Sequence, residues 1–165
     1  MRDDVDGLVQ AWRRERPDLD VTPLEVLSRV LRLARHLDLA RRTAFDGHGL
    51  EVWEFDVLAA LRRAGPPYTM SPSQLLTQTL VSSGTMTNRI DRLAARRLVE
   101  RRPDPDDGRS IQVHLTSAGR DRVDDAMADL LSREREILAP LTARQRATLA
   151  ALLRTLVAPF DQTET

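Results

Sequence analysis

The spacing of apolar residues predicts helices over most of the chain. Apolar side chains that recur every three or four residues indicate a helix that buries one face. This pattern predicts helices at residues 5–16, 22–44, 51–64, 71–78, 83–97, 117–138 and 143–158. The second of these is a long amphipathic helix, whose apolar stripe runs from Leu24 to Leu37. Thr22 is expected to cap this helix, because Pro23 then occupies the first helical position.

Two short segments instead alternate apolar and polar residues, as half-buried strands do. These segments are residues 98–102 and 111–115, and the turn-rich residues 103–108 separate them. The pattern therefore predicts a β-hairpin with a charged tip. The fold is expected to be mainly α with a small β-hairpin wing. A short helix, a tight turn, a second helix and a hairpin follow one another in the order of a winged helix-turn-helix.

The length of 165 residues suits about one domain. Within residues 1–165, the predicted winged helix-turn-helix lobe covers 51–116, and residues 1–46 and 117–165 supply helices that are expected to join two copies. A homodimer is expected because the terminal helices carry more apolar surface than one small lobe can cover. Their apolar stripes include Leu24, Leu27, Leu149, Leu152, Leu153 and Phe160.

Composition favours a cytoplasmic globular protein. Apolar residues make up 41% and charged residues 30% of the chain, and no apolar run is long enough to cross a bilayer, so no membrane partner is expected. The first residues are acidic and are not followed by the apolar core of a signal peptide. The chain has no cysteine, which excludes disulfides, thiolate metal sites and cysteine nucleophiles.

No enzyme motif is present in the sequence. His36, His48 and His114 lie far apart without the spacing of metal ligands, and the chain has neither a glycine-rich phosphate loop nor a G-x-S-x-G elbow. We therefore expect no catalytic residue, no metal site and no cofactor.

Positive charge is concentrated in one part of a chain whose net charge is zero. Residues 82–122 contain nine arginines and six acidic residues. All the basic residues of the chain are arginines, whose planar fork suits phosphate and guanine. This distribution favours double-stranded DNA as a partner, although a genome rich in G and C would also favour arginine over lysine.

Polar residues gather on the second helix of the motif, the candidate recognition helix. In a winged helix-turn-helix this helix enters the major groove and the hairpin lies along the backbone. The residues predicted to contact DNA are Ser82, Ser83, Thr85, Thr87, Asn88, Arg89, Arg92, Arg102 and Arg109. Alternatively, the serines and threonines only cap the helix, and Asn88 and Arg89 are solvated.

The wing leaves a second alternative open. Arg109 is expected to enter the narrow minor groove, or to form an ion pair with Asp107 or Asp104 that shapes the turn. A winged helix can also bind a protein partner instead of DNA, since fold does not fix function. The polar, arginine-bearing recognition helix disfavours that partner, which would select apolar residues there.

Four segments around the predicted hairpin resemble the MarR family of bacterial transcription regulators. They are TNRIDRL at residues 87–93, LVER at 98–101, DPDDGRS at 104–110 and VHLTSAG at 113–119. The resemblance implies a homodimer, joined through its N- and C-terminal helices, that binds a pseudo-palindromic operator.

The segment from Trp12 to Asp20 resembles a subgroup of this family that responds to urate and has an extra first helix. Carried over position by position, the ligand-binding residues of that subgroup fall on Trp12, Asp56, Arg89 and Arg101. The resemblance implies that a small anionic effector such as urate releases DNA from a repressor. A tricarboxylate or a phenolic compound is an alternative effector.

The residues themselves support such a site in part. Asp56 and Glu54 lie on opposite sides of the same predicted helix, so one of the two carboxylates is expected to face inward. An inward carboxylate needs a cation, and Arg89 or Arg101 could provide it. Alternatively, Asp56 pairs with Arg63 or another arginine, Trp12 only packs the first helix, and Arg101 contacts phosphate.

Overall fold

The computed structural model describes residues 2–79, 82–104 and 110–161. Every helix predicted from the apolar spacing is present. The elements in chain order are α1 (Asp4–Glu15), α2 (Thr22–Asp46), α3 (Val52–Arg63), β1 (Thr69–Met70), α4 (Pro72–Thr79), α5 (Ser83–Ala95), β2 (Val99–Pro103), β3 (Ile111–Leu115), α6 (Ser117–Ile137) and α7 (Ala143–Asp161). This arrangement confirms the expected fold class, a mainly helical chain with a small β wing.

The sheet has three antiparallel strands in the order β1-β3-β2. The predicted hairpin is formed by β2 and β3, with Val99 opposite Leu115 and Pro103 opposite Ile111. The sequence pattern did not predict β1, which pairs with the other edge of β3. A strand of two residues is too short to show an alternating pattern. The hairpin tip, which includes Asp107 and Arg109, lies outside the described residues.

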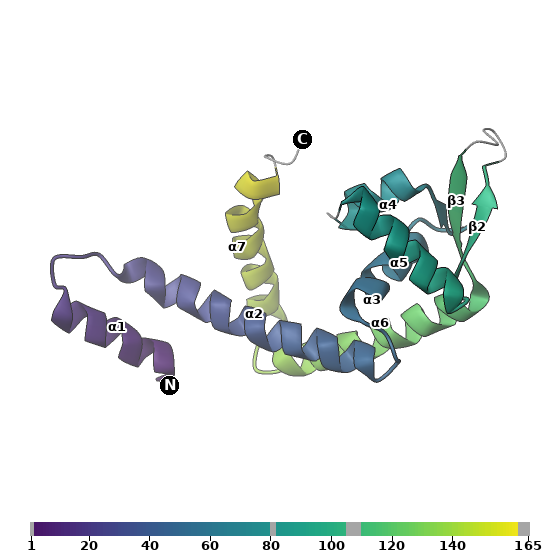
Figure 1. Ribbon diagram of the computed structural model, residues 1–165. Coiled ribbons are helices and arrows are strands. Elements are labelled where there is room, and N and C mark those ends of the chain that lie inside the picture. The colour runs from purple at the N-terminus through teal and green to yellow at the C-terminus, as the bar shows by residue number, and fades with distance from the viewer. Residues whose placement is uncertain (1, 80–81, 105–109, 162–165) are drawn as a thin grey trace.

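One large apolar core holds the lobe together. It packs α3, α4, α5 and the sheet against the last turn of α2 and against α6, which runs beneath the lobe (Figure 1). The rings of Phe45 and Phe55 stack with their centroids 3.9 Å apart, which joins α2 to α3. Ile90 and Leu93 on α5 are buried in the same core, so the orientation of α5 is fixed by packing.

The start of α6 is held tightly against the base of the wing. A Cβ added at Gly119 would lie 2.1 Å from the carbonyl oxygen of Leu98, so only glycine fits at this position. The hydroxyl of Thr116 accepts a hydrogen bond from the Gly119 amide at 3.0 Å and so caps α6. Close packing and this cap therefore hold the start of α6 in place against the base of the wing.

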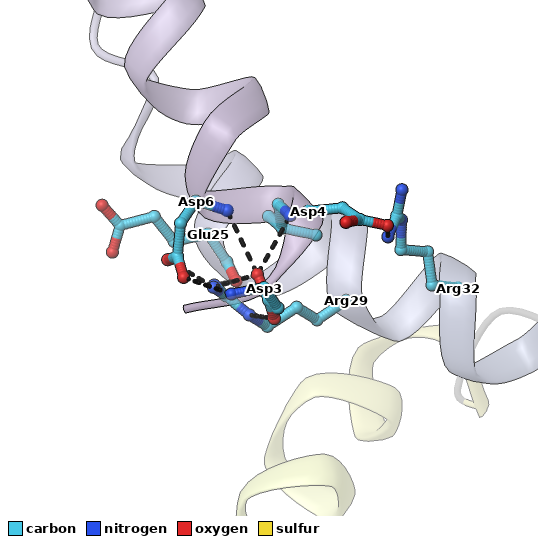
Figure 2. A network of polar contacts seen from close by, with 7 residues as sticks. Asp3, Asp4, Asp6, Glu25, Arg29 and Arg32 are labelled. Carbon is cyan, nitrogen blue, oxygen red and sulfur yellow. Dashed lines mark hydrogen bonds and ion pairs between the residues drawn. The ribbon is translucent and has the colours of Figure 1, made fainter. Parts of the chain in front are cut away.

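α1 packs on the N-terminal half of α2 through a small separate core. Val5, Val9 and Val21 are buried there, with Leu24 packed against them. Figure 2 shows the ion pairs that surround this contact, in which Arg29 is the central cation.

Arg29 joins α2 to the first turn of α1. Its guanidinium donates to Asp3 at 2.8 and 2.9 Å and to Asp6 at 2.7 Å, while Arg32 pairs with Asp4 at 2.7 Å. The hydrogen bond from Arg29 holds the pKa of Asp3 below its ordinary value. Asp3 also caps α1, because its side chain accepts from the backbone of Val5 and Asp6.

The start of α2 differs from the prediction. Thr22 is the first helical residue rather than the cap, and Val21 stands at the cap position without a side-chain hydrogen bond. The carboxylate of Asp20 accepts the Thr22 amide at 3.0 Å instead. An acceptor two residues earlier in the chain thus replaces the predicted threonine cap.

α7 stands apart from the lobe (Figure 1). None of its described residues is buried, although several are apolar. Leu152 and Phe160, for example, are 60% and 73% exposed. α2 exposes apolar side chains too, including Leu27 and Leu31. The part of the chain that the structure describes therefore leaves a large apolar surface uncovered.

Two kinds of site are absent from the described ranges. No group of three or more acidic, histidine or cysteine side chains there could hold a metal ion. The helices in these ranges lack the combination of length and apolar character that spanning a membrane requires.

Candidate functional site

The first half of α5 presents polar side chains to solvent. The helix buries Met86, Ile90 and Leu93, while its outer face exposes residues that the sequence predicted as DNA contacts. The exposed residues of this set are Ser82, Ser83, Thr85, Thr87, Asn88 and Arg92. A helix that buries one face and exposes hydroxyl and amide groups on the other has the form of a groove-binding element.

The hydroxyl of Ser82 does not cap α5. Ser82 stands at the cap position of α5, but its side chain makes no hydrogen bond to the helix backbone. Its Oγ lies 2.9 Å from Thr85 Oγ1, and both residues are exposed. Capping, the alternative role, therefore does not explain Ser82, whereas the Thr87 hydroxyl donates to the Ser83 carbonyl within the helix at 3.2 Å.

Two arginines of α5 meet Trp53 in the first turn of α3. The guanidinium carbon of Arg89 lies 5.4 Å from the Trp53 ring centroid, and that of Arg92 lies 4.7 Å from it. Arg92 also pairs with Glu51 at 2.5 Å, and Glu51 accepts the Trp53 indole N–H at 2.7 Å. The hydrogen bond from Trp53 and the pairing with Arg92 hold the pKa of Glu51 below its ordinary value.

The arginines of β2 form exposed ion pairs. Arg101 pairs with Asp91 of α5 at 2.7 Å, and Arg102 pairs with Glu100 of the same strand at 2.9 Å. Such pairs contribute little to stability, so phosphate can replace these carboxylates at little cost. Arg109 lies outside the described residues.

An open hollow of about 1050 Å³ lies beside the recognition helix. The end of α2, the turn after it, the first turn of α3 and one side of α5 form its walls. The lining residues are Asp38, Arg42, Thr43, Asp46, Gly49, Leu50, Glu51, Val52, Trp53, Glu54, Asp56, Arg89 and Arg96. Asp56 and Arg89, which the sequence predicted as ligand-binding residues, therefore face the same space.

Asp56 is not the inward carboxylate. Glu54 is 1% exposed, whereas the side chain of Asp56 is 42% exposed and pairs with Arg41 at 2.8 Å. The prediction that one of the two faces inward is confirmed, and so is the alternative that another arginine pairs with Asp56. Arg89 and Arg101 were the expected partners of the buried carboxylate, but Arg96 is the actual one.

Arg96 fixes Glu54 at the floor of the hollow. Its Nη1 lies 2.5 Å from Glu54 Oε2, and its Nη2 donates to the carbonyl of Gly49 at 2.7 Å. The same Glu54 carboxylate accepts the Glu51 amide at 2.9 Å. The end of α5, the start of α3 and the turn after α2 are thus joined through one buried carboxylate.

Arg89 is the arginine most available to an anion in the hollow. The other lining arginines meet carboxylates, since Arg42 pairs with Asp38 at 2.8 Å and Arg96 pairs with Glu54. For Arg89, the part of the chain that the structure describes shows the Trp53 ring and no carboxylate. An uncompensated guanidinium on a flat aromatic face suits a planar anion.

The other two predicted ligand-binding residues lie elsewhere in the single chain. Trp12 is 47% exposed on the outer face of α1, next to Leu8, Ala11 and Glu15. It is not part of the small core that holds α1 to α2, so anchoring α1 does not explain it. Arg101 does not line the hollow and pairs with Asp91. The chain therefore brings Asp56 and Arg89 together and separates Trp12 and Arg101 from them.

Sequence reasoning missed Trp53. The residue stands in the apolar run 52–58, where an aromatic side chain is expected to pack in the core. Nothing in the pattern distinguishes a ring that faces arginines from one that is fully buried.

Known proteins resemble this chain in sequence and in fold. The sequence profile of the MarR family matches residues 48–110, from the turn after α2 to the residue before β3. The transcriptional regulator PecS of Dickeya dadantii is 38% identical over 150 residues, which cover 91% of this chain and 90% of that protein.

Solved structures of similar proteins include one with DNA. A mutant MarR of Escherichia coli, complexed with operator DNA, superimposes with a TM-score of 0.67 at 26% identity, covering 84% of this chain and 99% of that one. BpsR of Bordetella bronchiseptica superimposes with a TM-score of 0.64 at 26% identity, over 79% of this chain and 91% of that one. Its structure concerns regulation of DNA binding by 6-hydroxynicotinic acid.

Proposed function

The chain belongs to the MarR family of transcriptional regulators, and from this premise we propose that it is a ligand-responsive repressor that binds a pseudo-palindromic operator as a homodimer. The observation that carries the proposal is the polar, exposed first half of α5 beside a β wing. In this arrangement the helix enters the major groove and the wing follows the backbone.

Side chains on α5 supply the contacts to bases. The exposed hydroxyls and the amide of Asn88 can donate to and accept from base edges, and the free backbone amides at the start of the helix attract phosphate. Arg102 exchanges Glu100 for a phosphate, and Arg109 is assigned to the minor groove. The related MarR structure with operator DNA supports this use of the fold.

A second copy of the chain covers the apolar surface of the terminal helices. α7 buries none of its described residues, and α2 exposes apolar side chains along its length. An amphipathic helix without a partner gains its stability by burying that stripe. A symmetric dimer places two recognition helices about one helical turn of DNA apart, which accounts for a pseudo-palindromic operator.

A small planar anion such as urate occupies the hollow and releases the DNA. Arg89 supplies the positive charge, Trp53 supplies an aromatic face, and Asp56 also lines the hollow. Because Arg89 belongs to the recognition helix, an anion bound to it acts directly on the element that holds DNA. The related BpsR, whose DNA binding is regulated by 6-hydroxynicotinic acid, supports an effector of this class.

The DNA-binding part is tested with a duplex that the protein selects from a random-sequence pool. We expect an enriched inverted repeat, and an affinity that falls steeply with salt as phosphates are neutralised. A pool without enrichment, or an affinity without salt dependence, would favour a protein partner and contradict the proposal.

The effector part is tested by the ratio of operator affinities without and with urate. The wild type should show a large ratio, and Arg89→Gln should bring it close to one. Arg63→Gln removes the same charge from an exposed position of α3 and should leave the ratio unchanged. A wild type that retains DNA through millimolar urate excludes urate, and 6-hydroxynicotinate and aconitate are then tested in the same assay.

A further inference from the structure

Three arginines form a stripe on the recognition helix. Arg89, Arg92 and Arg96 are spaced by three and four residues, so at 100° per residue they lie within about 60° of one another on one face. All three side chains reach the beginning of α3. Arg89 and Arg92 meet the Trp53 ring, Arg92 also pairs with Glu51, and Arg96 pairs with Glu54.

The ion pairs made by these arginines differ in how exposed they are to solvent. Glu54 is buried and Arg96 is 38% exposed, so their pair is screened less by solvent than a fully exposed pair and acts as the firmer attachment. Arg92 and Glu51 are each more than half exposed, so this pair alone is weak. The Trp53 ring strengthens it, because the ring stacks against the Arg92 guanidinium while its indole N–H binds Glu51.

We propose that Trp53 positions the recognition helix by holding Arg92 together with Glu51, and that Arg92 acts through this contact rather than by touching DNA. The proposal rests on the DNA-binding function above. It reassigns Arg92, which the sequence predicted as a DNA contact, to a positioning role. The ring, the carboxylate and the guanidinium form one unit, so removing any member releases the others.

The first test is a double-mutant cycle on the selected operator duplex. Trp53→Leu and Arg92→Gln should each weaken operator binding about tenfold, within the range found for side chains that share partners. The double variant should be no weaker than the worse single variant, because both changes break the same unit. Trp53→Phe keeps an aromatic face for Arg92 and should retain most of the affinity.

The second test is the dependence of affinity on salt. A lost phosphate contact lowers the slope of log affinity against log salt by about one, and a lost positioning contact leaves the slope unchanged. Arg92→Gln should therefore keep the wild-type slope, and Arg102→Gln, at a proposed phosphate contact, should reduce it. Arg63→Gln is the charge-matched control with wild-type affinity and slope. Urea unfolding of each variant shows whether it remains folded.

Several outcomes would overturn the proposal. Losses in the double variant that equal the product of the single losses would show that Trp53 and Arg92 act separately. A slope that falls by about one in Arg92→Gln would make Arg92 a phosphate contact. If wild-type protein enriches no duplex at all, the DNA-binding function itself fails and this inference fails with it. If the wild type binds operator and the losses of the Trp53 and Arg92 variants are additive, this inference fails while the DNA-binding function stands.

Discussion

At the scale of single residues, Glu54 joins the start of α3 to the end of α5. Among the described residues, Glu54 is the charged side chain that is buried. Its Oε2 accepts hydrogen bonds from Arg96 and from the Glu51 amide. A buried carboxylate is tolerated only with such partners. The recognition helix is therefore attached to α3 by an interaction that is costly to break.

Arg96→Leu should destabilise the protein by about 3 kcal/mol, because it leaves the Glu54 carboxylate buried without a cation. Urea unfolding of the variant and the wild type measures this difference. Arg63→Leu, at an exposed position of α3, should change stability by less than about 0.5 kcal/mol. Equal losses in the two variants would show that the ion pair with Glu54 has no special role.

Pairing of side chains was the least predictable property at this scale. The alternation of Glu54 and Asp56 around one helix showed that one of them faces inward, but only the packing of α3 shows which one. The chain contains 25 arginines and 25 acidic residues, so sequence spacing cannot assign partners that lie far apart. The pairs of Asp56 with Arg41 and of Glu54 with Arg96 are examples.

At the scale of elements, periodicity was sufficient for the helices and the hairpin. Each helix is long enough to show its apolar stripe, and β2 and β3 are long enough to alternate. β1 has two residues and was not predicted, although it completes the sheet by pairing with β3. The sequence therefore predicted the elements that are long enough to show a periodic pattern, and it did not predict the two-residue β1.

Gly119→Ala should destabilise the junction of α6 and the wing by about 2 kcal/mol, since the new Cβ overlaps the Leu98 carbonyl and backbone must shift. Thermal or urea unfolding measures the loss. Gly84→Ala on α5 is the matched control, because its Cβ meets nothing within 4 Å and alanine favours the helix. If the two alanine variants are equally stable, the close approach at Gly119 is not limiting.

Acid should release α1 from α2. Hydrogen bonds hold the pKa of Asp3 and of Asp6 below 3.8, with Arg29 the leading cause at Asp3 and the Asp3 backbone the leading cause at Asp6. A carboxylate with a lowered pKa stabilises the folded state fully above its unfolded value and loses this effect as pH falls through the folded value. Docking of α1 is therefore expected to weaken below about pH 3.8.

Hydrogen exchange of the α1 amides, corrected for intrinsic rates, checks this expectation between pH 5 and pH 3. Protection should fall in the wild type over this range. Arg29→Gln removes the shared cation and should show low protection at pH 5 already. Unchanged protection of α1 at both pH values would mean that the apolar contacts of Val5 and Val9 suffice.

At the scale of the whole molecule, the lobe and the terminal helices differ in how much of their apolar surface is buried. The lobe has a large core of its own, whereas α1, α2 and α7 expose apolar stripes that the chain does not cover. The sequence indicated this excess of apolar surface, and it cannot show which surfaces meet, because that depends on a second copy. The dimer stays a proposal with a direct test.

Truncation after Pro140 should yield a monomer that barely binds operator, because α7 is removed together with its apolar stripe. Sedimentation velocity measures the mass, and an operator shift measures binding. In the full chain, Leu152→Asp should weaken the dimer, whereas Arg154→Asp on the same exposed helix should not. Intact wild-type protein that sediments as a monomer would refute the dimer.

The separate placement of Trp12 and Trp53 has a practical consequence. These are the two tryptophans of the chain, so they are its two strongest natural fluorophores. Trp12 lies on exposed α1, and Trp53 lies in the hollow against the recognition helix. Replacing either indole leaves an emission spectrum that reports on one end of the molecule. Occupation of the hollow can then be followed in a variant that keeps only Trp53, and changes around α1 in a variant that keeps only Trp12.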